Sequence, residues 1–478
     1  MLFYLNQFVM KRKTMKIIVT ILLYLITVVA SMQAQILVTG NKLLDDAFLL
    51  AVRTMDNNTN DSLLKAGGNY GGEWTRDISI NGWNAASLLR PKIVEHSLWK
   101  VTVNNRSVVG HEYWDKIIWV IGAWNHYLVT GNVDFLKQAY FTSKATMTEM
   151  ENYAFEINYG LFMGPAVFQD GIAGYEEPVY DPKTKMTHVL KHKNTCAIKC
   201  LSTNAVYYRA YILLAEMAKK FEPEAVAAFS QKAMLLKDNI RKYFFNEKTG
   251  GLYYLIDHRG YPHNFTEGLG ISYATIFDLL TAEEAKKIIA NAYQSKYGLP
   301  CVYPHFKRFN DRCPGRHNVM VWPFINAFYG EACVKTGNYE KFWFEVNNAA
   351  DLAINKGKND FIEVYDPVTG EPSGGWQIGK THPIRHNQTW NATGYIRMFL
   401  NSIFGINLKE DGIYFTPLGM PGERKIKLEN IPYRDAVLNI TVHGYGNRVK
   451  NVLINGKKQD EAFLPAIVEG KVNIDIML

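Results

Sequence analysis

Cysteine is scarce in this chain, with five in 478 residues. The odd count leaves at least one thiol unpaired, which excludes a small disulfide-stapled scaffold. Proline is limited to 17 residues and apolar residues make up 47% of the chain, which excludes the disordered and collagen-like classes. No basic stripe occurs beyond the N-terminal segment, so the sequence does not indicate a nucleic-acid partner. These absences leave an ordinary globular protein that is long enough to bury a large core.

Long apolar runs are also rare, and the single clear one spans residues 17–30. Basic residues precede this run and supply four of the eight net positive charges, leaving about +4, while Ala34 offers a small residue for cleavage. This pattern predicts a signal peptide over residues 1–34 and a periplasmic or secreted mature protein. A membrane anchor is the alternative, but the run is short for a span of about 20 residues. We expect no stable membrane insertion after cleavage.

Metal-ligand motifs are sparse as well. His192, Cys196 and Cys200 recur at every fourth residue and could line one face of a helix as ligands. No fourth ligand accompanies them, so we interpret these thiols as buried or incidental. We therefore expect no bound metal and no cofactor.

Amphipathic helices dominate the chain from about residue 42 to residue 405. Apolar residues recur at helical spacing, and short links such as Gly131-Asn132 imply antiparallel neighbours. Thr281 and Glu284 form the pattern of a capping box. The predicted helices cover residues 42–57, 77–90, 92–103, 112–130, 134–157, 202–221, 223–245, 267–280, 281–295, 319–335, 339–356 and 387–404. Twelve helices without a tight repeat predict a mainly α fold, an (α/α)6 barrel of six helical hairpins over residues 35–408.

After Gly405 the pattern changes to apolar and polar residues that alternate between turn signals. Residues 409–478 are therefore predicted to form a small antiparallel, β-sandwich-like module.

Three long non-helical stretches interrupt the helices, at about residues 159–201, 296–318 and 357–386. Loops of this length in a compact domain usually carry function. The first contains Asp170 among apolar residues and glycines, a setting that can bury a carboxyl group and favour its proton-donating form. Glu176 and Glu177 are alternatives for that role. The third contains Glu363, and inverting glycoside hydrolysis requires such a second carboxylate.

The start of the second predicted helix carries Trp74, Arg76 and Asp77. An adjacent arginine and aspartate beside an indole can hold a pair of vicinal hydroxyls. An ordinary helix N-terminus, where aspartate is common, explains the same residues.

Four segments together resemble a known family: 74–77, 316–324, 363–370 and 388–395, which read Trp-Thr-Arg-Asp, Arg-His-Asn-Val-Met-Val-Trp-Pro-Phe, Glu-Val-Tyr-Asp-Pro-x-x-Gly and Gln-Thr-Trp-Asn-Ala-x-Gly-Tyr. In this order they are similar to the (α/α)6 six-hairpin glycosidases, closest to the trehalase and glycoside hydrolase family 63 group with its mannosylglycerate-hydrolase-like members. The resemblance implies an exo-acting, inverting enzyme that releases a terminal α-linked sugar from an oligosaccharide or glycoside.

The resemblance also implies roles for individual residues. Glu363 matches the general base, and Asp170 takes the general acid's position, although the local sequence differs from the Glu-Ser-Gly-x-Asp type common in those families. Residues predicted to bind substrate are Trp74, Arg76, Asp77, Trp119, Tyr175, Glu177, His317, Trp322 and Trp390.

Two alternatives to this activity remain open. Other enzymes share the six-hairpin architecture, including α-rhamnosidases and unsaturated glucuronyl hydrolases. An acidic substrate would need a cationic pocket, for which His382, Arg385 and His386 are candidates, although these residues also fit a solvated loop. A carbohydrate-binding protein without turnover is the other alternative, because aromatic residues make up 13% of the chain.

Overall fold

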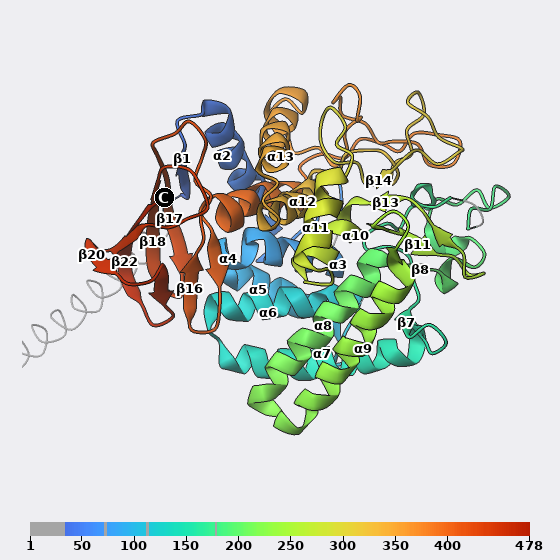
Figure 1. Cartoon of the computed structure of the whole chain (residues 1–478), viewed down its shortest axis with the longest axis horizontal. Coiled ribbons are helices and arrows are strands. Elements are labelled where there is room, and N and C mark those ends of the chain that lie inside the picture. Colours follow the sequence, from blue (N-terminus) through green and yellow to red (C-terminus); the bar gives the residue numbers. More distant parts are fainter. Residues whose placement is uncertain (1–33, 71–73, 111–113, 177–178) are drawn as a thin grey trace, which may run out of the picture.

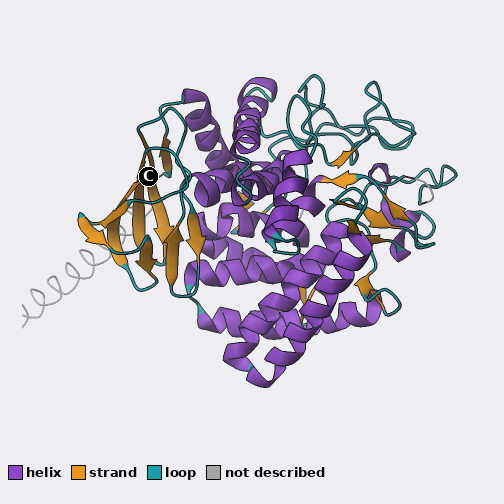
Figure 2. Cartoon of the chain, viewed as in Figure 1, coloured by secondary structure: helices purple, strands orange, loops and turns teal. Residues whose placement is uncertain are grey.

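The computed structural model describes residues 34–70, 74–110, 114–176 and 179–478. Apart from Ala34, the predicted signal peptide lies outside the described residues. A large helical body and a smaller β module sit side by side (Figure 1). Figure 2 shows that nearly all the long helices belong to the body. None of the helices in the described part of the chain combines the length and apolarity needed to cross a bilayer.

All twelve predicted helices are present, most with ends within a few residues of the prediction. Three of them, α3, α13 and α14, continue into π-helical turns. The capping box at Thr281 and Glu284 is formed. The helices are α2 (Lys42–Asn57), α3 (Thr75–Asn81) with its turn Gly82–Ala86 and α4 (Ser87–Leu89), α5 (Pro91–Lys100), α6 (Trp119–Thr130), α7 (Val133–Ala154), α8 (Leu201–Phe221), α9 (Val226–Phe244), α10 (Gly268–Ile276), α11 (Ala282–Asn291), α12 (Pro323–Lys335), α13 (Tyr339–Asp351) with its turn Leu352–Lys356, and α14 (Thr389–Arg397) with its turn Met398–Ile403.

Six of these helices form a closed inner ring. Helices α3, α6, α8, α10, α12 and α14 each contact the next, and α14 returns to α3. Their sequences explain this position, because α10 is apolar on every side whereas the outer helix α11 has one charged face. Gly122 of α6 allows close packing in the ring, since a Cβ atom there would lie 3.0 Å from the backbone of Ser79 in α3. The predicted six-hairpin barrel is confirmed.

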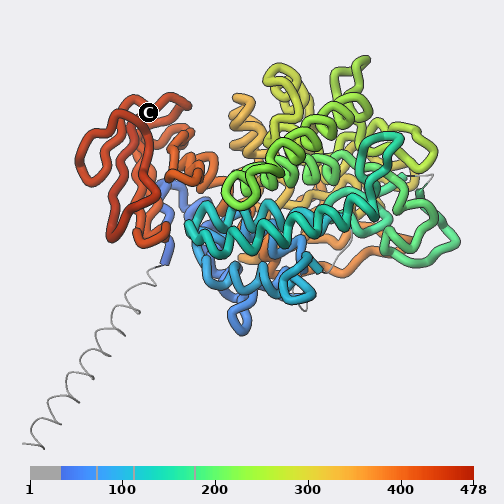
Figure 3. Tube along the Cα trace, turned by 90° about the horizontal axis from the view of Figure 1, so that it is seen from below, coloured from blue at the N-terminus to red at the C-terminus, as the bar shows by residue number. Residues whose placement is uncertain are grey.

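The β module contains two sheets. The larger has the order β1 (Ile36–Val38), β17 (Lys425–Tyr433), β18 (Asp435–His443), β22 (Glu469–Met477), β19 (Asn451–Ile454) and β20 (Lys457–Gln459). The smaller has β15 (Ile406–Leu408), β16 (Gly412–Phe415) and β21 (Phe463–Pro465). Residues 36–38 were assigned to the barrel from the sequence but pair with β17 instead, and β18 with β22 forms a parallel pair in an otherwise antiparallel module. Figure 3 shows the N-terminal strand beside this module.

Short strands line the loops of the barrel. They are β2 (Thr59–Asn60), β3 (Leu63–Leu64), β4 (Thr102–Val103), β5 (Val108–Val109), β6 (Phe155–Glu156), β7 (Leu161–Phe162), β8 (Lys199–Cys200), β9 (Phe245–Asn246), β10 (Gly251–Leu252), β11 (Leu255–Ile256), β12 (Pro262–His263), β13 (Thr266–Glu267) and β14 (Val302–Tyr303).

The three long loops have a common position in the fold, and this position determines where the site lies. Each leads into an inner helix, namely α8, α12 or α14. The inner helices all run in the same direction, because each follows an antiparallel outer helix. The loops and the inner-helix N-termini therefore gather at one end of the barrel, away from the β module (Figure 2).

Candidate active site

A small pocket of about 70 Å³ opens at this end of the barrel. It brings together segments that are far apart in the sequence, including all three long loops and the start of α3. The lining residues are Ala66, Tyr70, Trp74, Arg76, Asp77, Phe168, Asp170, Arg316, His317, Trp322, Glu363 and Trp390. The structure thus places both candidate catalytic carboxylates, Asp170 and Glu363, in one pocket.

Glu363 is buried, with 3% of its surface exposed. The Tyr70 hydroxyl donates a hydrogen bond to its Oε1 at 2.7 Å, and the Arg316 guanidinium forms an ion pair with its Oε2. Burial and the adjacent Glu363 charge raise the pKa of Tyr70 well above its usual range, so the phenol stays a donor. The Asn391 amide donates to the backbone carbonyl groups of Ile362 and Glu363. These bonds fix a carboxylate whose remaining lone pairs can accept a proton.

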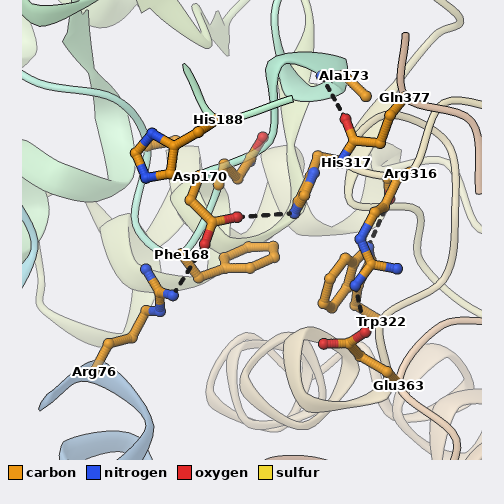
Figure 4. A network of polar contacts seen from close by, with 12 residues as sticks. Arg76, Phe168, Asp170, Ala173, His188, Arg316, His317, Trp322, Glu363 and Gln377 are labelled. Carbon is orange, nitrogen blue, oxygen red and sulfur yellow. Dashed lines mark hydrogen bonds and ion pairs between the residues drawn. The ribbon is translucent and has the colours of Figure 1, made fainter. Parts of the chain in front are cut away.

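Asp170 has a different environment. Its side chain is 39% exposed, with Arg76 Nη2 3.4 Å from Oδ2 and His317 Nε2 3.8 Å from Oδ1 (Figure 4). Burial and the adjacent Arg316 charge hold the pKa of His317 well below its usual range, so this imidazole is neutral. The expectation that Asp170 is buried among apolar groups is wrong, because its carboxylate opens onto the pocket beside polar side chains.

The loop that carries Asp170 is held on several sides. Phe168 has a positive φ of 61°, and its backbone N–H donates to Oδ2 of Asp115 at 3.0 Å. The Ala173 N–H donates to the Gln377 side chain at 3.2 Å. At Gly171 a Cβ atom would lie 2.4 Å from the His317 ring, so the loop packs too closely for any other residue. The acid candidate therefore sits on a rigid segment.

The Trp74, Arg76 and Asp77 segment opens α3 at the pocket. Burial raises the pKa of Asp77 to about 7, and the adjacent Arg76 opposes this rise. The shortest contact of that guanidinium with Asp77 is 3.9 Å, from Nε to Oδ2. The arrangement has the donors and acceptors that a sugar hydroxyl pair requires.

Aromatic rings form the walls of the pocket. The His317 ring is stacked on Trp322 at 5.0 Å, and Trp390 is stacked on Phe324 at 4.3 Å. Phe168 meets Trp322 and Phe324 edge to face. In the view of Figure 4 the rings of Phe168 and Trp322 lie between the two carboxylates.

Comparison with known families identifies this pocket. Residues 89–390 match the model of the mannosylglycerate hydrolase MGH1-like glycoside hydrolase domain. The chain belongs to this family. The glycoside hydrolase fold and the resemblance to the family 63 group are thereby confirmed, and the chain is a glycosidase of that type. No curated protein matches the sequence of the chain.

Solved structures share the fold of this glycosidase at 13–15% sequence identity. A sialidase superposes with a TM-score of 0.68 over 90% of this chain and 40% of its own. A family 78 rhamnosidase of a Bacillus species superposes with a TM-score of 0.63 over 86% of this chain and 41% of its own. The family 63 mannosylglycerate hydrolase from Thermus thermophilus, in complex with glucose, has a TM-score of 0.56 over 73% of this chain and 98% of its own. The glycosidase thus spans less than half of the first two proteins.

Some candidates do not reach the pocket of the glycosidase. Trp119 is fully buried, donates its indole N–H to the Leu98 carbonyl and packs on Trp99 in the core. Tyr175 is also fully buried, where it accepts from the backbone of Ala166 and donates to that of Gln169. It supports the acid's loop from behind.

Of the two alternative acids, Glu176 is not among the lining residues and accepts a hydrogen bond from the backbone of Lys307. Glu177 lies outside the described residues.

The cationic cluster of the third loop is dispersed. His386 bonds to Asp360 at 2.7 Å, and the ring of His382 contacts the Pro383 carbonyl. Arg385 stacks over Tyr70 at 5.2 Å, but neither it nor the two histidines line the pocket.

Sequence reasoning missed several residues of the site. The sequence assigns no role to Tyr70, Asp115 or Phe168, and Arg316 stands in the segment 316–324 without one. The glycines on either side of Asn69-Tyr70 are the only signal for Tyr70, because they allow the chain to approach the pocket closely.

The suggested metal motif does not form a site. His192 contacts the Met186 carbonyl through Nε2, and Cys200 is buried whereas Cys196 is exposed. Within the described part of the chain, no group of three or more histidine, cysteine or acidic residues could hold a metal ion.

Proposed function

We propose that this glycosidase is exo-acting and inverting, and that it releases a terminal α-linked sugar from an oligosaccharide or glycoside. The observation that carries the proposal is the unequal setting of two carboxylates in one pocket. Asp170 opens onto the pocket and can protonate a glycosidic oxygen. Glu363 is paired with Arg316 and, as a base, can take a proton from water.

The reaction follows from these settings. Asp170 gives its proton to the glycosidic oxygen as the bond to the anomeric carbon breaks. Glu363 accepts a proton from a water molecule, whose oxygen attacks the anomeric carbon from the opposite face. Glu363 then returns its proton to solvent, because the Arg316 charge favours the carboxylate, and Asp170 takes a proton back.

The pocket itself supports action on chain ends. It is small and walled by Trp322 and Trp390, which suits one sugar ring better than the interior of a polymer. Arg76 and Asp77 are placed to hold the hydroxyls of that ring. We also propose that the protein acts in the periplasm or outside the cell, from the predicted signal peptide.

The test follows the anomeric protons by NMR while the mature protein acts on α- and β-linked glucosides, mannosides, galactosides and rhamnosides. The β-anomer of the released sugar should appear first, from an α-linked substrate. Release with retention, or cleavage of internal bonds, would refute the proposal. The rhamnosides matter because the fold likeness to the Bacillus rhamnosidase covers 86% of this chain, and α-rhamnosidase activity is the second candidate.

Variants connect the activity to the two carboxylates. Glu363→Gln and Asp170→Asn should each lower kcat by about 10²- to 10⁴-fold, the usual contribution of a general base or acid. Glu461→Gln, at an exposed position in the β module, is the matched control and should keep full activity. Near wild-type turnover in either pocket variant would remove that residue from the mechanism.

A further inference from the structure

A general acid beside an arginine raises a difficulty. Asp170 must hold a proton before it can give one, yet Arg76 Nη2 lies 3.4 Å from its Oδ2. A nearby positive charge favours the ionised form of a carboxyl group. The charge of Arg76, if it were not shared with another carboxylate, would therefore oppose protonation of Asp170.

Asp115 removes part of this charge from behind the pocket. Its side chain is only 1% exposed, and its Oδ2 accepts from Arg76 Nη1 at 2.9 Å. The guanidinium thus contacts the buried carboxylate of Asp115 more closely than it contacts Asp170. In a buried site the shorter ion pair dominates, because water does not screen it.

The same carboxylate oxygen also holds the acid's loop. It accepts from the Phe168 N–H at 3.0 Å, two residues before Asp170. Phe168 has a positive φ of 61°, which a bulky side chain adopts only when its surroundings impose it. Asp115 therefore joins the arginine and the strained backbone through one atom.

Other charged and titratable groups also face Asp170. Among them Asp77, another carboxylate near Arg76, lies farther from that guanidinium than Asp115 does. Asp77 and Arg76 approach from α3, neutral His317 from the loop before α12, and Glu363 lies across the pocket in its own ion pair. The backbone of His188 pairs with that of Gly171, and Figure 4 draws the His188 ring beside Asp170.

We propose that Asp115 is a positioning residue that keeps Asp170 in its proton-donating form, by neutralising Arg76 and by fixing the Phe168 backbone. This proposal rests on the proposed function, in which Asp170 is the general acid.

The test is the pH profile of kcat/KM for Asp115→Asn. The asparagine keeps an oxygen that can accept from the Phe168 N–H and loses the negative charge. Arg76 then loses the carboxylate that it contacts at 2.9 Å and acts more strongly on Asp170, so the alkaline limb should move to lower pH by about one unit. With a glycosyl fluoride, whose leaving group needs no proton, the loss at neutral pH should disappear.

Variants that should shift the alkaline limb in opposite directions distinguish this role from a merely structural one. Arg76→Met removes the cation and should move the alkaline limb to higher pH, whereas the double variant with Asp115→Asn should return it toward the wild-type position. Asp115→Glu keeps the charge and should keep the wild-type limb. An unmoved limb in Asp115→Asn, or an equal loss of kcat/KM at every pH, would overturn the proposal.

A direct titration covers the case in which turnover is too low to measure. The ¹³C signal of the Asp170 carboxyl group, assigned by its absence in Asp170→Asn, should titrate at lower pH in Asp115→Asn than in the wild type. An unchanged titration would overturn the proposal. Failure of the proposed function has a different signature, because Asp170→Asn would then hydrolyse substrates as fast as the wild type.

Discussion

Glu267 makes folding stability depend on pH in a direction opposite to that of most carboxylates. It is fully buried at the start of α10, beneath the loop that carries Asp170. Its Oε2 accepts from the Ser202 N–H at 3.2 Å, and Oε1 has no hydrogen-bond partner among the described residues. Ser202 in turn accepts from the Val167 N–H in that loop. Burial raises the pKa of Glu267 to about 8.

The direction and the size of this pH dependence follow from the linkage between proton binding and folding. Between its ordinary pKa of 4.5 and the folded pKa of about 8, Glu267 keeps a proton in the folded state that it loses in the unfolded state. The free energy of unfolding therefore falls as pH rises, by about 1.4 kcal/mol per pH unit. Across pH 5 to 8 this amounts to about 4 kcal/mol from one residue.

The Glu267→Gln variant removes this dependence. Its unfolding in urea, followed by tryptophan fluorescence at pH 5, 6, 7 and 8, should show a curve of free energy against pH that falls about 4 kcal/mol less than that of the wild type. The comparison uses the change with pH because the buried amide itself costs about 1–3 kcal/mol. Glu461→Gln, at an exposed position, should parallel the wild type. Parallel curves for Glu267→Gln and the wild type would refute the reasoning.

Three further substitutions test the site. Tyr70→Phe removes the donor to Glu363 and should lower kcat/KM by about 10- to 100-fold with an unchanged circular dichroism spectrum, because a hydrogen bond to a charged group is worth about 1.5–3 kcal/mol; an unchanged kcat/KM would contradict this. Gly171→Ala places a Cβ atom 2.4 Å from His317 and should lower kcat by about 100-fold, because the loop that carries Asp170 must move. Wild-type turnover would show that the loop accommodates the methyl group without displacing Asp170. Trp119→Ala should lower the free energy of unfolding by about 3–5 kcal/mol in urea titrations and leave KM unchanged, because this indole is in the core; a raised KM at unchanged stability would place it in the pocket.

The sequence contains enough information for the barrel because its signals are local. In α11, the capping box, the charged outer face and the apolar inner face are all read within about ten residues. The β module is less predictable. The parallel pairing of β18 with β22, and the addition of β1 to β17, join segments that are distant in the chain, and alternation alone specifies neither partner nor direction.

The candidate site also has parts that the sequence predicts and parts that it does not. The loops before α12 and α14 had to meet, because the N-termini of alternate helices in a ring of hairpins share one end. Asp115 could not be assigned a role, since its partners Arg76 and Phe168 lie 39 and 53 residues away. Trp119 was misplaced because an aromatic side chain at helical spacing serves a core as well as a sugar-binding wall.

The charge of the pocket bears on which sugars it accepts. Its described lining residues include the acidic residues Asp77, Asp170 and Glu363 and the cations Arg76 and Arg316, while His317 is neutral. Each guanidinium is already paired with a carboxylate within the protein. An acidic sugar in the pocket would therefore find both of these guanidinium groups already paired with protein carboxylates. This argues against an unsaturated glucuronide as substrate and favours a neutral ring, for which paired carboxylates and guanidinium groups are good hydroxyl acceptors and donors.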